Sequence, residues 1–139
     1  MDPTELIARE QIRELVATYA HCADSGRFEE LAALFDADGV LETPDGRTFR
    51  GPAAILAFLG TAKAQLAASN ASGPIRHHVS SLHIDVTGPS DATGAAYFLV
   101  LTARGLDHWG RYRDRYIARD GHWRFAERRV RLDARTAPR

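Results

Sequence analysis

A tyrosine, an aspartate and two histidines are the residues of this 139-residue chain best suited to moving a proton. Tyr19 continues an apolar stripe at helical spacing, and Asp24 follows the last apolar position of that stripe. His77 and His78 are adjacent in a later β-type segment. An imidazole can take up a proton near neutral pH, and a carboxylate on its other nitrogen fixes the ring and stabilises the charge that forms. Such a pair would be a general base.

The same residues also have structural interpretations. Asp24 could cap the helix that follows it, and Tyr19 could fill the core with its hydroxyl bonded to a neighbour. Strict alternation from the apolar positions 82, 84 and 86 puts His78 on their face and His77 on the other. A bulge at Ser80–Ser81 would exchange the two faces. Periodicity therefore leaves open which histidine faces the interior.

Further polar residues alternate along the later segments. Tyr112 and Asp114 share one face of an expected strand with Tyr116, while the intervening positions are arginines. This face suits a half-polar cavity wall. We expect four residues to bind substrate: Tyr112, Asp114, Arg128 and Trp123. Of these, Tyr112 or Arg128 could hydrogen-bond a carbonyl or a leaving hydroxyl as charge develops on it, as could Tyr19.

The elements that must position these residues are helices in the first half and strands in the second. Apolar spacing predicts helices from Pro3 to about residue 24, over 27–35, and after Gly51-Pro52. A short hairpin over 40–50 and a loop over 67–74 separate them from strands over 75–86, 92–103, 110–119 and 122–132. We expect one α+β domain over residues 1–132 and a frayed tail over 133–139. A curved, mostly antiparallel sheet around the N-terminal helices would enclose an internal pocket for a small apolar ligand.

Composition excludes several other classes. The formal net charge is zero, which argues against a nucleic-acid binder or an anionic-membrane binder. Cys22 is the single cysteine, and no segment resembles a leader or a membrane span, so we expect a cytoplasmic protein. No His-x-x-x-His, Cys-x-x-Cys, glycine-rich phosphate loop or Gly-x-Ser-x-Gly motif occurs. We therefore expect no metal site, no phosphate-binding loop and no serine nucleophile.

Several motifs resemble one known family in order along nearly the whole chain. They are the run from Tyr19 through Asp24 to Phe35, Arg47-Thr-Phe-Arg-Gly51-Pro, Arg76-His77-His-Val-Ser-Ser, Gly110-Arg-Tyr112-Arg-Asp114, and Gly121-His-Trp123-Arg-Phe-Ala-Glu-Arg128. The chain resembles SnoaL-like proteins of the NTF2-like superfamily, in the branch with scytalone dehydratase, bile-acid 7α-dehydratase and hexachlorocyclohexane dehydrochlorinase. The resemblance implies a cone-shaped fold and a homodimer formed through the open sheet face.

The resemblance also implies roles for individual residues. His77 rather than His78 would be the base, Asp24 its partner and Tyr19 an acid or an orienting group, which requires the bulge at Ser80–Ser81. We therefore expect a cofactor-independent lyase of the dehydratase type, or an isomerase, acting on a small hydrophobic or cyclic substrate through a His-Asp dyad. The alternatives are a non-catalytic protein that binds a small hydrophobic ligand, and a dimeric interaction module.

Overall fold

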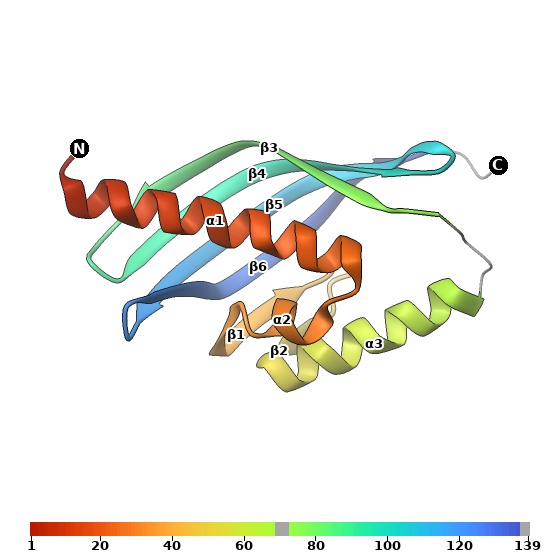
Figure 1. Cartoon of the computed structure of the whole chain (residues 1–139), viewed down its shortest axis with the longest axis horizontal. Helices are drawn as coiled ribbons and strands as arrows, with labels where there is room; N and C mark the ends of the chain where they lie inside the picture. The colour runs from red at the N-terminus through yellow and green to blue at the C-terminus, as the bar shows by residue number, and fades with distance from the viewer. Residues whose placement is uncertain (69–72, 137–139) are drawn as a thin grey trace.

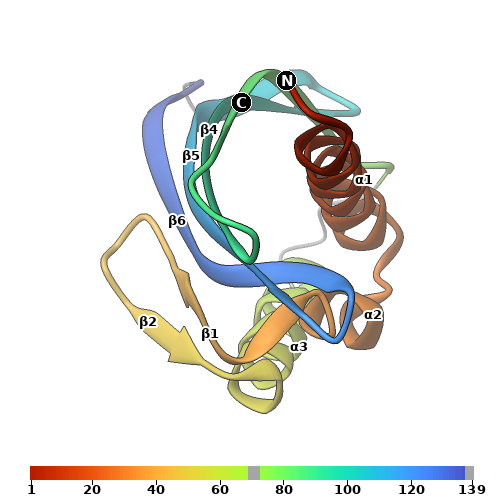
Figure 2. The same ribbon diagram turned by 90° about the vertical axis from the view of Figure 1, so that its left-hand side faces the viewer.

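The computed structural model describes residues 1–68 and 73–136, which form helices packed on one curved sheet (Figure 1). The elements in chain order are α1 (Pro3–Ser25), α2 (Phe28–Ala32), β1 (Phe35–Glu42), β2 (Thr48–Arg50), α3 (Pro52–Ala68), β3 (Arg76–Val86), β4 (Asp91–Thr102), β5 (Gly105–Arg119) and β6 (His122–Arg135). The strand order is β2-β1-β6-β5-β4-β3, and every neighbouring pair is antiparallel except β1 and β6. The sheet is open, and its concave side faces α1 (Figure 2). The expected α+β cone with a curved sheet is confirmed.

Local sequence signals define both ends of α1. The side chain of Asp2 accepts a hydrogen bond from the Glu5 amide at 2.9 Å, and Pro3 occupies the first turn. Gly26 ends the helix in the left-handed conformation, at φ 70°, where a side chain would be strained. The buried face agrees with the apolar stripe of the sequence and consists of Ala8, Ile12, Leu15, Val16, Tyr19, Ala20 and Cys22. The stripe packs α1 against β3 and β6.

The second helix is shorter than we expected, because Phe35 belongs to a strand. The helix ends at Ala32, and the Phe125 amide donates to the Leu34 carbonyl oxygen at 2.9 Å. Phe35 is opposite Phe125 in the parallel pairing of β1 with β6, and their ring centroids are 5.1 Å apart. Contact with a strand 90 residues later in the chain has overridden a local helical pattern.

Three other boundaries also differ from expectation. The third helix, α3, continues through Ala68, into the segment expected as a loop; residues 69–72 of that loop lie outside the described part of the chain. β5 begins at Gly105, five residues before the expected start, and has a pairing irregularity between Trp109 and Gly110. β6 continues to Arg135, so residues 133–135 belong to the sheet rather than to a tail.

The bulge expected in β3 is confirmed. The β3–β4 register shifts between Ser80 and His83, and Ser81 has φ 54°. Before the shift His77 is partly buried and His78 exposed, whereas after it the partly or fully buried positions are 82, 84 and 86. The bulge therefore turns His77, rather than His78, towards the helices.

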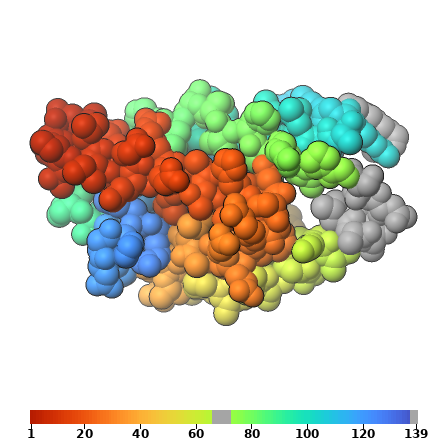
Figure 3. Space-filling view, viewed as in Figure 1, coloured from red at the N-terminus to blue at the C-terminus, as the bar shows by residue number. Residues whose placement is uncertain are grey.

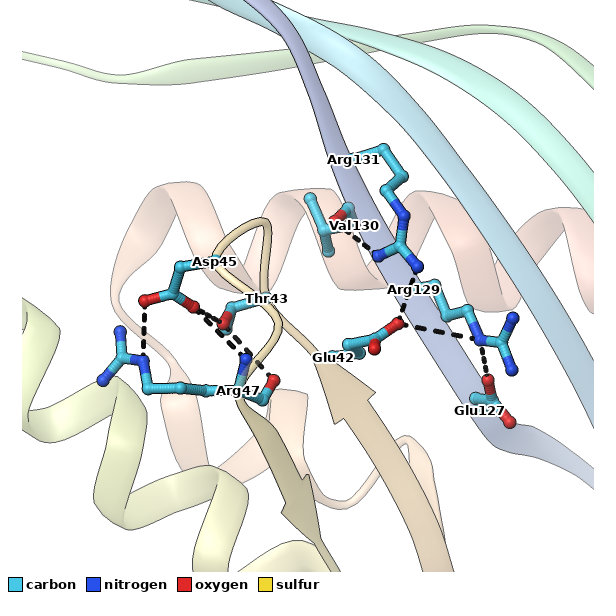
Figure 4. A network of polar contacts seen from close by, with 8 residues as sticks. All are labelled: Glu42, Thr43, Asp45, Arg47, Glu127, Arg129, Val130 and Arg131. Atoms are coloured by element: carbon cyan, nitrogen blue, oxygen red, sulfur yellow. Dashed lines mark hydrogen bonds and ion pairs between the residues drawn. The ribbon is translucent and has the colours of Figure 1, made fainter.

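Charged side chains cover part of the outer face of the sheet. Glu42 of β1 contacts Arg129 at 3.7 Å and Arg131 at 3.0 Å, both on β6 (Figure 4). Asp45 bonds Arg47 within the turn that joins β1 to β2. The contacts of Glu42 link the first strand pair to β6 from the solvent side. No helix among the described residues is long and apolar enough to cross a membrane.

Candidate active site

Asp24 and His77 meet where the last turn of α1 packs against the start of β3. The Nδ1 atom of His77 is 2.6 Å from the Oδ1 atom of Asp24. The backbone amide of His77 also donates to both carboxylate oxygens, at 3.2 and 3.0 Å. Arg27, rather than Asp24, is the N-cap residue of α2, and it makes no side-chain cap bond. The carboxylate of Asp24 is thus within hydrogen-bonding reach of His77, as the family resemblance implies.

This contact decides which imidazole nitrogen of His77 bonds the carboxylate and which one does not. A carboxylate accepts hydrogen bonds, so Nδ1 of His77 is the nitrogen that donates, and in the neutral form of the ring the lone pair is then on Nε2. The two side chains are 22% (His77) and 13% (Asp24) exposed, so both are shielded without being sealed from solvent. They border a surface hollow of about 740 Å³ between the end of α1 and the start of β3 (Figure 3). A small molecule entering this hollow meets the pair.

Aromatic rings extend from His77 along the concave face of the sheet. The Phe98 ring on β4 has its centroid 6.5 Å from that of His77 and is stacked on Tyr112 of β5 at 4.6 Å. Tyr112 in turn meets the edge of Tyr19 at 6.1 Å. Burial raises the pKa values of Tyr19 and Tyr112 above the ordinary phenol value, so both hydroxyls stay neutral and able to donate.

A fully buried ion pair lies behind these rings. Arg128 donates from Nε to Oδ1 of Asp114 at 2.9 Å and from Nη2 to Oδ2 at 3.0 Å, and neither side chain is exposed. Tyr116 donates its hydroxyl to Oδ2 at 2.8 Å. Burial opposes the charge of Arg128, but the charge and hydrogen bonds of Asp114, with contributions from Tyr112 and Tyr19, together outweigh it, and the pKa of the guanidinium stands above its ordinary value. Arg128 therefore stays charged.

The guanidinium of Arg128 also touches the aromatic wall. It lies 3.7 Å from the ring centroid of Tyr112 and 4.3 Å from that of Tyr19, which are cation–π distances. Within the described residues, no hydrogen-bond partner reaches its Nη1 atom. A buried donor without a partner is costly, and here the charge of the guanidinium is offset by Asp114 and by the faces of these rings.

The residues expected to form the site are therefore not all together. Tyr19, Tyr112 and Arg128 make one cluster. Asp114 is on the same face, but it bonds Arg128 and Tyr116 and is closed inside the core rather than forming a cavity wall. Trp123 borders a separate depression with residues from the middle of α1, including Leu15 and Thr18. The binding roles of these residues stay predictions.

The structure adds one histidine that the sequence reasoning missed. His108 of β5 has Nδ1 2.7 Å from Oδ2 of Asp107, and its ring meets Phe98 at 6.0 Å. The adjacent Asp107 and His108 were a visible signal, but the strand was expected to begin only at Gly110, so their face could not be assigned. Across the described residues, no group of three or more His, Cys, Asp or Glu side chains is placed to hold a metal ion.

The comparisons with known proteins agree with this architecture. The model of the SnoaL-like domain family matches residues 4–129, so the chain belongs to the SnoaL-like family. Its fold is the NTF2-like one: an NTF2-like protein with a cystatin-like fold from Novosphingobium aromaticivorans is 30% identical, with a TM-score of 0.77 over 98% of this chain and 93% of that one. Among curated proteins, none matches.

Two further solved structures are similar to nearly the whole of this chain. An aspartate-to-asparagine variant of Rv3472, a Mycobacterium tuberculosis protein of unknown function, is 33% identical with a TM-score of 0.80, covering 96% of this chain and 77% of that one. A Novosphingobium aromaticivorans protein provisionally named a scytalone dehydratase is 25% identical with a TM-score of 0.83, covering 98% and 91%. Family and neighbours fit a role of the isomerase or dehydratase type.

Proposed function

We propose that this protein is a cofactor-independent lyase that eliminates water from a small cyclic β-hydroxy ketone. The observation that carries the proposal is the 2.6 Å contact between Asp24 and Nδ1 of His77, which leaves Nε2 as a base beside an aromatic wall. The neighbour provisionally named a scytalone dehydratase supports dehydration as the reaction. The aromatic rings of Phe98, Tyr112 and Tyr19 suit a hydrophobic ring as substrate.

In this reaction His77 removes a proton from the carbon next to the ketone. Asp24 holds the ring in position and stabilises the imidazolium that forms. The electrons of the broken C–H bond move into the carbonyl, and the resulting enolate oxygen needs hydrogen-bond donors. The Nη1 atom of Arg128 and the hydroxyls of Tyr19 and Tyr112 are donors of the right kind. Collapse of the enolate then expels the β-hydroxyl group; return of the proton to another carbon would make the same site an isomerase.

The test compares two adjacent histidines. The His77→Ala and His78→Ala variants and the unmodified protein are assayed by mass-detected chromatography on cyclic β-hydroxy ketones that include scytalone and β-hydroxycyclohexanone. His77→Ala should lower turnover about 10²–10⁴-fold, the usual contribution of a general base, with an unchanged circular dichroism spectrum. His78→Ala, which changes an exposed neighbour that borders the same hollow, should lower turnover far less than His77→Ala. Unchanged turnover in His77→Ala refutes the assignment, and ligand binding without any turnover favours the non-catalytic alternative.

We also propose that a second copy of the chain covers the outer face of β4 and β5. Five large apolar side chains are exposed there: Tyr97 at 58%, Leu99 and Leu101 at 37%, and Leu106 and Trp109 at 36%. Leu99 pairs with Trp109 and Leu101 with Leu106, so the group is continuous, as interaction surfaces commonly are. Sedimentation should report a dimer that Leu99→Glu weakens; a monomer at all concentrations would contradict this.

Cys22 is buried and forms no disulfide, which suits the reducing cytoplasm that we expect.

A further inference from the structure

The hollow in front of His77 carries more positive than negative charge. Its ionised lining residues are Arg27, Arg76 and Asp24. The carboxylate of Asp24 already accepts from the backbone amide and from Nδ1 of His77, so much of its charge is satisfied within the protein. The two guanidiniums are therefore the charges that a molecule in this hollow would meet, in a chain whose formal net charge is zero.

The two arginines differ in how far the protein neutralises them. Nη1 of Arg27 is 3.7 Å from Oε2 of Glu30, and these side chains are 50% and 63% exposed. Water weakens so long and so exposed an ion pair. Arg76 donates from Nη1 to the Ile75 carbonyl oxygen at 2.8 Å, and no carboxylate in the described part of the chain pairs with it. One positive charge at the hollow thus has no counter-charge among the described residues.

Both arginines border the mouth of the hollow rather than its inner wall. Arg27 belongs to the turn between α1 and α2 and is exposed. Arg76 begins β3, the last strand of the sheet, and alternation turns its side chain to the opposite side from that of His77. Accordingly, His77 is partly buried whereas Arg76 is exposed. A molecule whose inner end reaches His77 would therefore have its outer end near these guanidiniums.

The chemistry of this site changes from aromatic inside to cationic outside. Behind His77, the Phe98 ring begins the aromatic wall, with its centroid 6.5 Å from that of the imidazole. At the mouth, a guanidinium is a planar fork that can bind a carboxylate through two parallel hydrogen bonds. One guanidinium without a counter-charge matches a group with a single negative charge. A molecule with an apolar ring at one end and a carboxylate at the other fits both parts.

We propose that the substrate carries a carboxylate on its ring and that Arg76, together with Arg27, binds this carboxylate at the mouth of the hollow; this substrate class rests on the proposed function. The carboxylate is unchanged by the reaction. It holds the outer end of the molecule, so that the ring carbon that loses its proton points towards His77. Positive charge at the mouth also attracts acids from solution before contact. The two arginines are thus specificity residues and not catalytic ones.

The test compares an acid with its methyl ester. (3-Hydroxy-5-oxocyclohexyl)acetate and its methyl ester have the same reacting ring and differ by one negative charge. The unmodified protein should have a kcat/KM about 3–20-fold higher for the acid, as expected for one or two exposed ion pairs. Potassium chloride at about 0.5 M should reduce this preference, because salt screens exposed charges.

Four variants assign the preference to the arginines. Arg76→Gln should lower the ratio of the two kcat/KM values about 2–5-fold, by raising KM for the acid. Arg27→Gln should have a smaller effect in the same direction, because Glu30 already shares its charge. The double variant should turn over acid and ester equally. Arg13→Gln changes an exposed arginine of α1 that lies roughly 16 Å before Asp24 along the helix, and as the control it should keep the preference.

The outcomes separate this substrate class from the proposed function. Equal kcat/KM values for acid and ester in the unmodified protein, or a preference that survives in the double variant, would overturn the role of the arginines and leave His77 as the base. If the double variant does not fold, Arg76→Gln decides by the same ratio. If neither substrate is turned over, the proposed function fails, and calorimetric titration with cyclohexylacetate and its methyl ester decides the anion site alone. Tighter binding of the acid that Arg76→Gln weakens supports this site, and equal binding of acid and ester overturns it.

Discussion

Two aspartates on the same side of the sheet differ in how far their contacts use up the polar atoms of the pair. Asp114 is in the core, where Arg128 and Tyr116 use both of its oxygens and no part of the ion pair is exposed. Asp24 is at the edge, where it bonds the amide and the imidazole of His77 and remains 13% exposed. The first arrangement satisfies charge within the protein. The second occupies only Nδ1 of His77, and under the proposed function Nε2 is the base that meets the substrate.

The difference in burial decides whether a substitution should affect mainly the stability of the fold or mainly the proposed chemistry. Removing one member of a buried ion pair strands the other charge in the core, which costs much of the stability of a domain. Removing one member of a partly exposed pair lets water replace the lost contact. The fold then survives, and only the proposed role of the pair in proton transfer is lost. The two aspartates should therefore respond to the same substitution in opposite ways.

The largest expected effect is on folding, from Asp114→Asn. This change keeps the shape of the side chain but leaves the guanidinium of Arg128 buried without a counter-charge. The free energy of unfolding should fall by about 3–5 kcal/mol, the usual cost of breaking a buried ion pair. Urea denaturation followed by circular dichroism measures it. A loss below about 1 kcal/mol, the size typical of exposed pairs, would contradict the burial of this pair.

The double variant Asp114→Leu with Arg128→Met sharpens that result. It removes both charges together, so no charge is stranded, and buried pairs replaced in this way often lose little stability. The double variant should be more stable than Asp114→Asn alone. If it is less stable, the ion pair itself, rather than the stranded charge, stabilises the fold.

The next effect is on turnover, from Asp24→Asn. The amide oxygen can still accept from the His77 backbone, so unfolding should change by about 1 kcal/mol, the value of one hydrogen bond. The amide NH₂, however, favours the imidazole tautomer that carries its proton on Nε2, and the base is then blocked. Turnover of the best cyclic β-hydroxy ketone should fall about 10²–10⁴-fold. A large loss of stability with normal turnover would contradict the difference that we infer between Asp24 and Asp114.

Much of the fold was predictable because local signals agree with the tertiary structure. The Asp2 cap, the apolar stripe and Gly26 predict α1 almost to the residue. Phe35 was wrongly assigned to a helix because its partner, Phe125, is distant in sequence and contributes nothing to a local pattern. The ends of β5 and β6 were missed for the same reason, since each is defined by pairing with the other.

The site was predictable only as far as bulges can be foreseen. A serine pair hinted at the shift in β3 that turns His77 inward, but only the family resemblance chose between the histidines. A second irregularity, between Arg115 and Tyr116, moves the β5–β6 register by one residue and brings Arg128 opposite Asp114. Without it Asp114 would face Glu127, a repulsive pair. No local sequence pattern predicts this bulge, so the buried ion pair between Arg128 and Asp114 could not be derived from the sequence.

A smaller effect should appear at alkaline pH. Burial raises the pKa values of Tyr19, Tyr112 and Tyr116 above 10.0, so the folded state keeps protons that the unfolded chain releases. The stability that these phenols contribute is complete below pH 10 and is lost as pH rises above it, by about 1.4 kcal/mol per pH unit for each group. Urea midpoints measured above pH 10 should therefore fall less steeply for Tyr112→Phe than for the unmodified protein. Equal slopes would show that hydroxide reaches this ring in the folded state.

The smallest effect should come from the ion pairs on the outer face. Arg131 donates to Glu42 at 3.0 Å, nearly the distance that joins Arg128 to Asp114, but its side chain is 40% exposed and that of Glu42 is 22% exposed (Figure 4). Water and salt screen this pair, and Glu42 keeps Arg129 nearby at 3.7 Å. Arg131→Ala should therefore change the free energy of unfolding by only about 0–1 kcal/mol, and added salt should shrink the change further. A loss as large as that of Asp114→Asn would mean that distance, rather than burial, sets the strength of ion pairs in this fold.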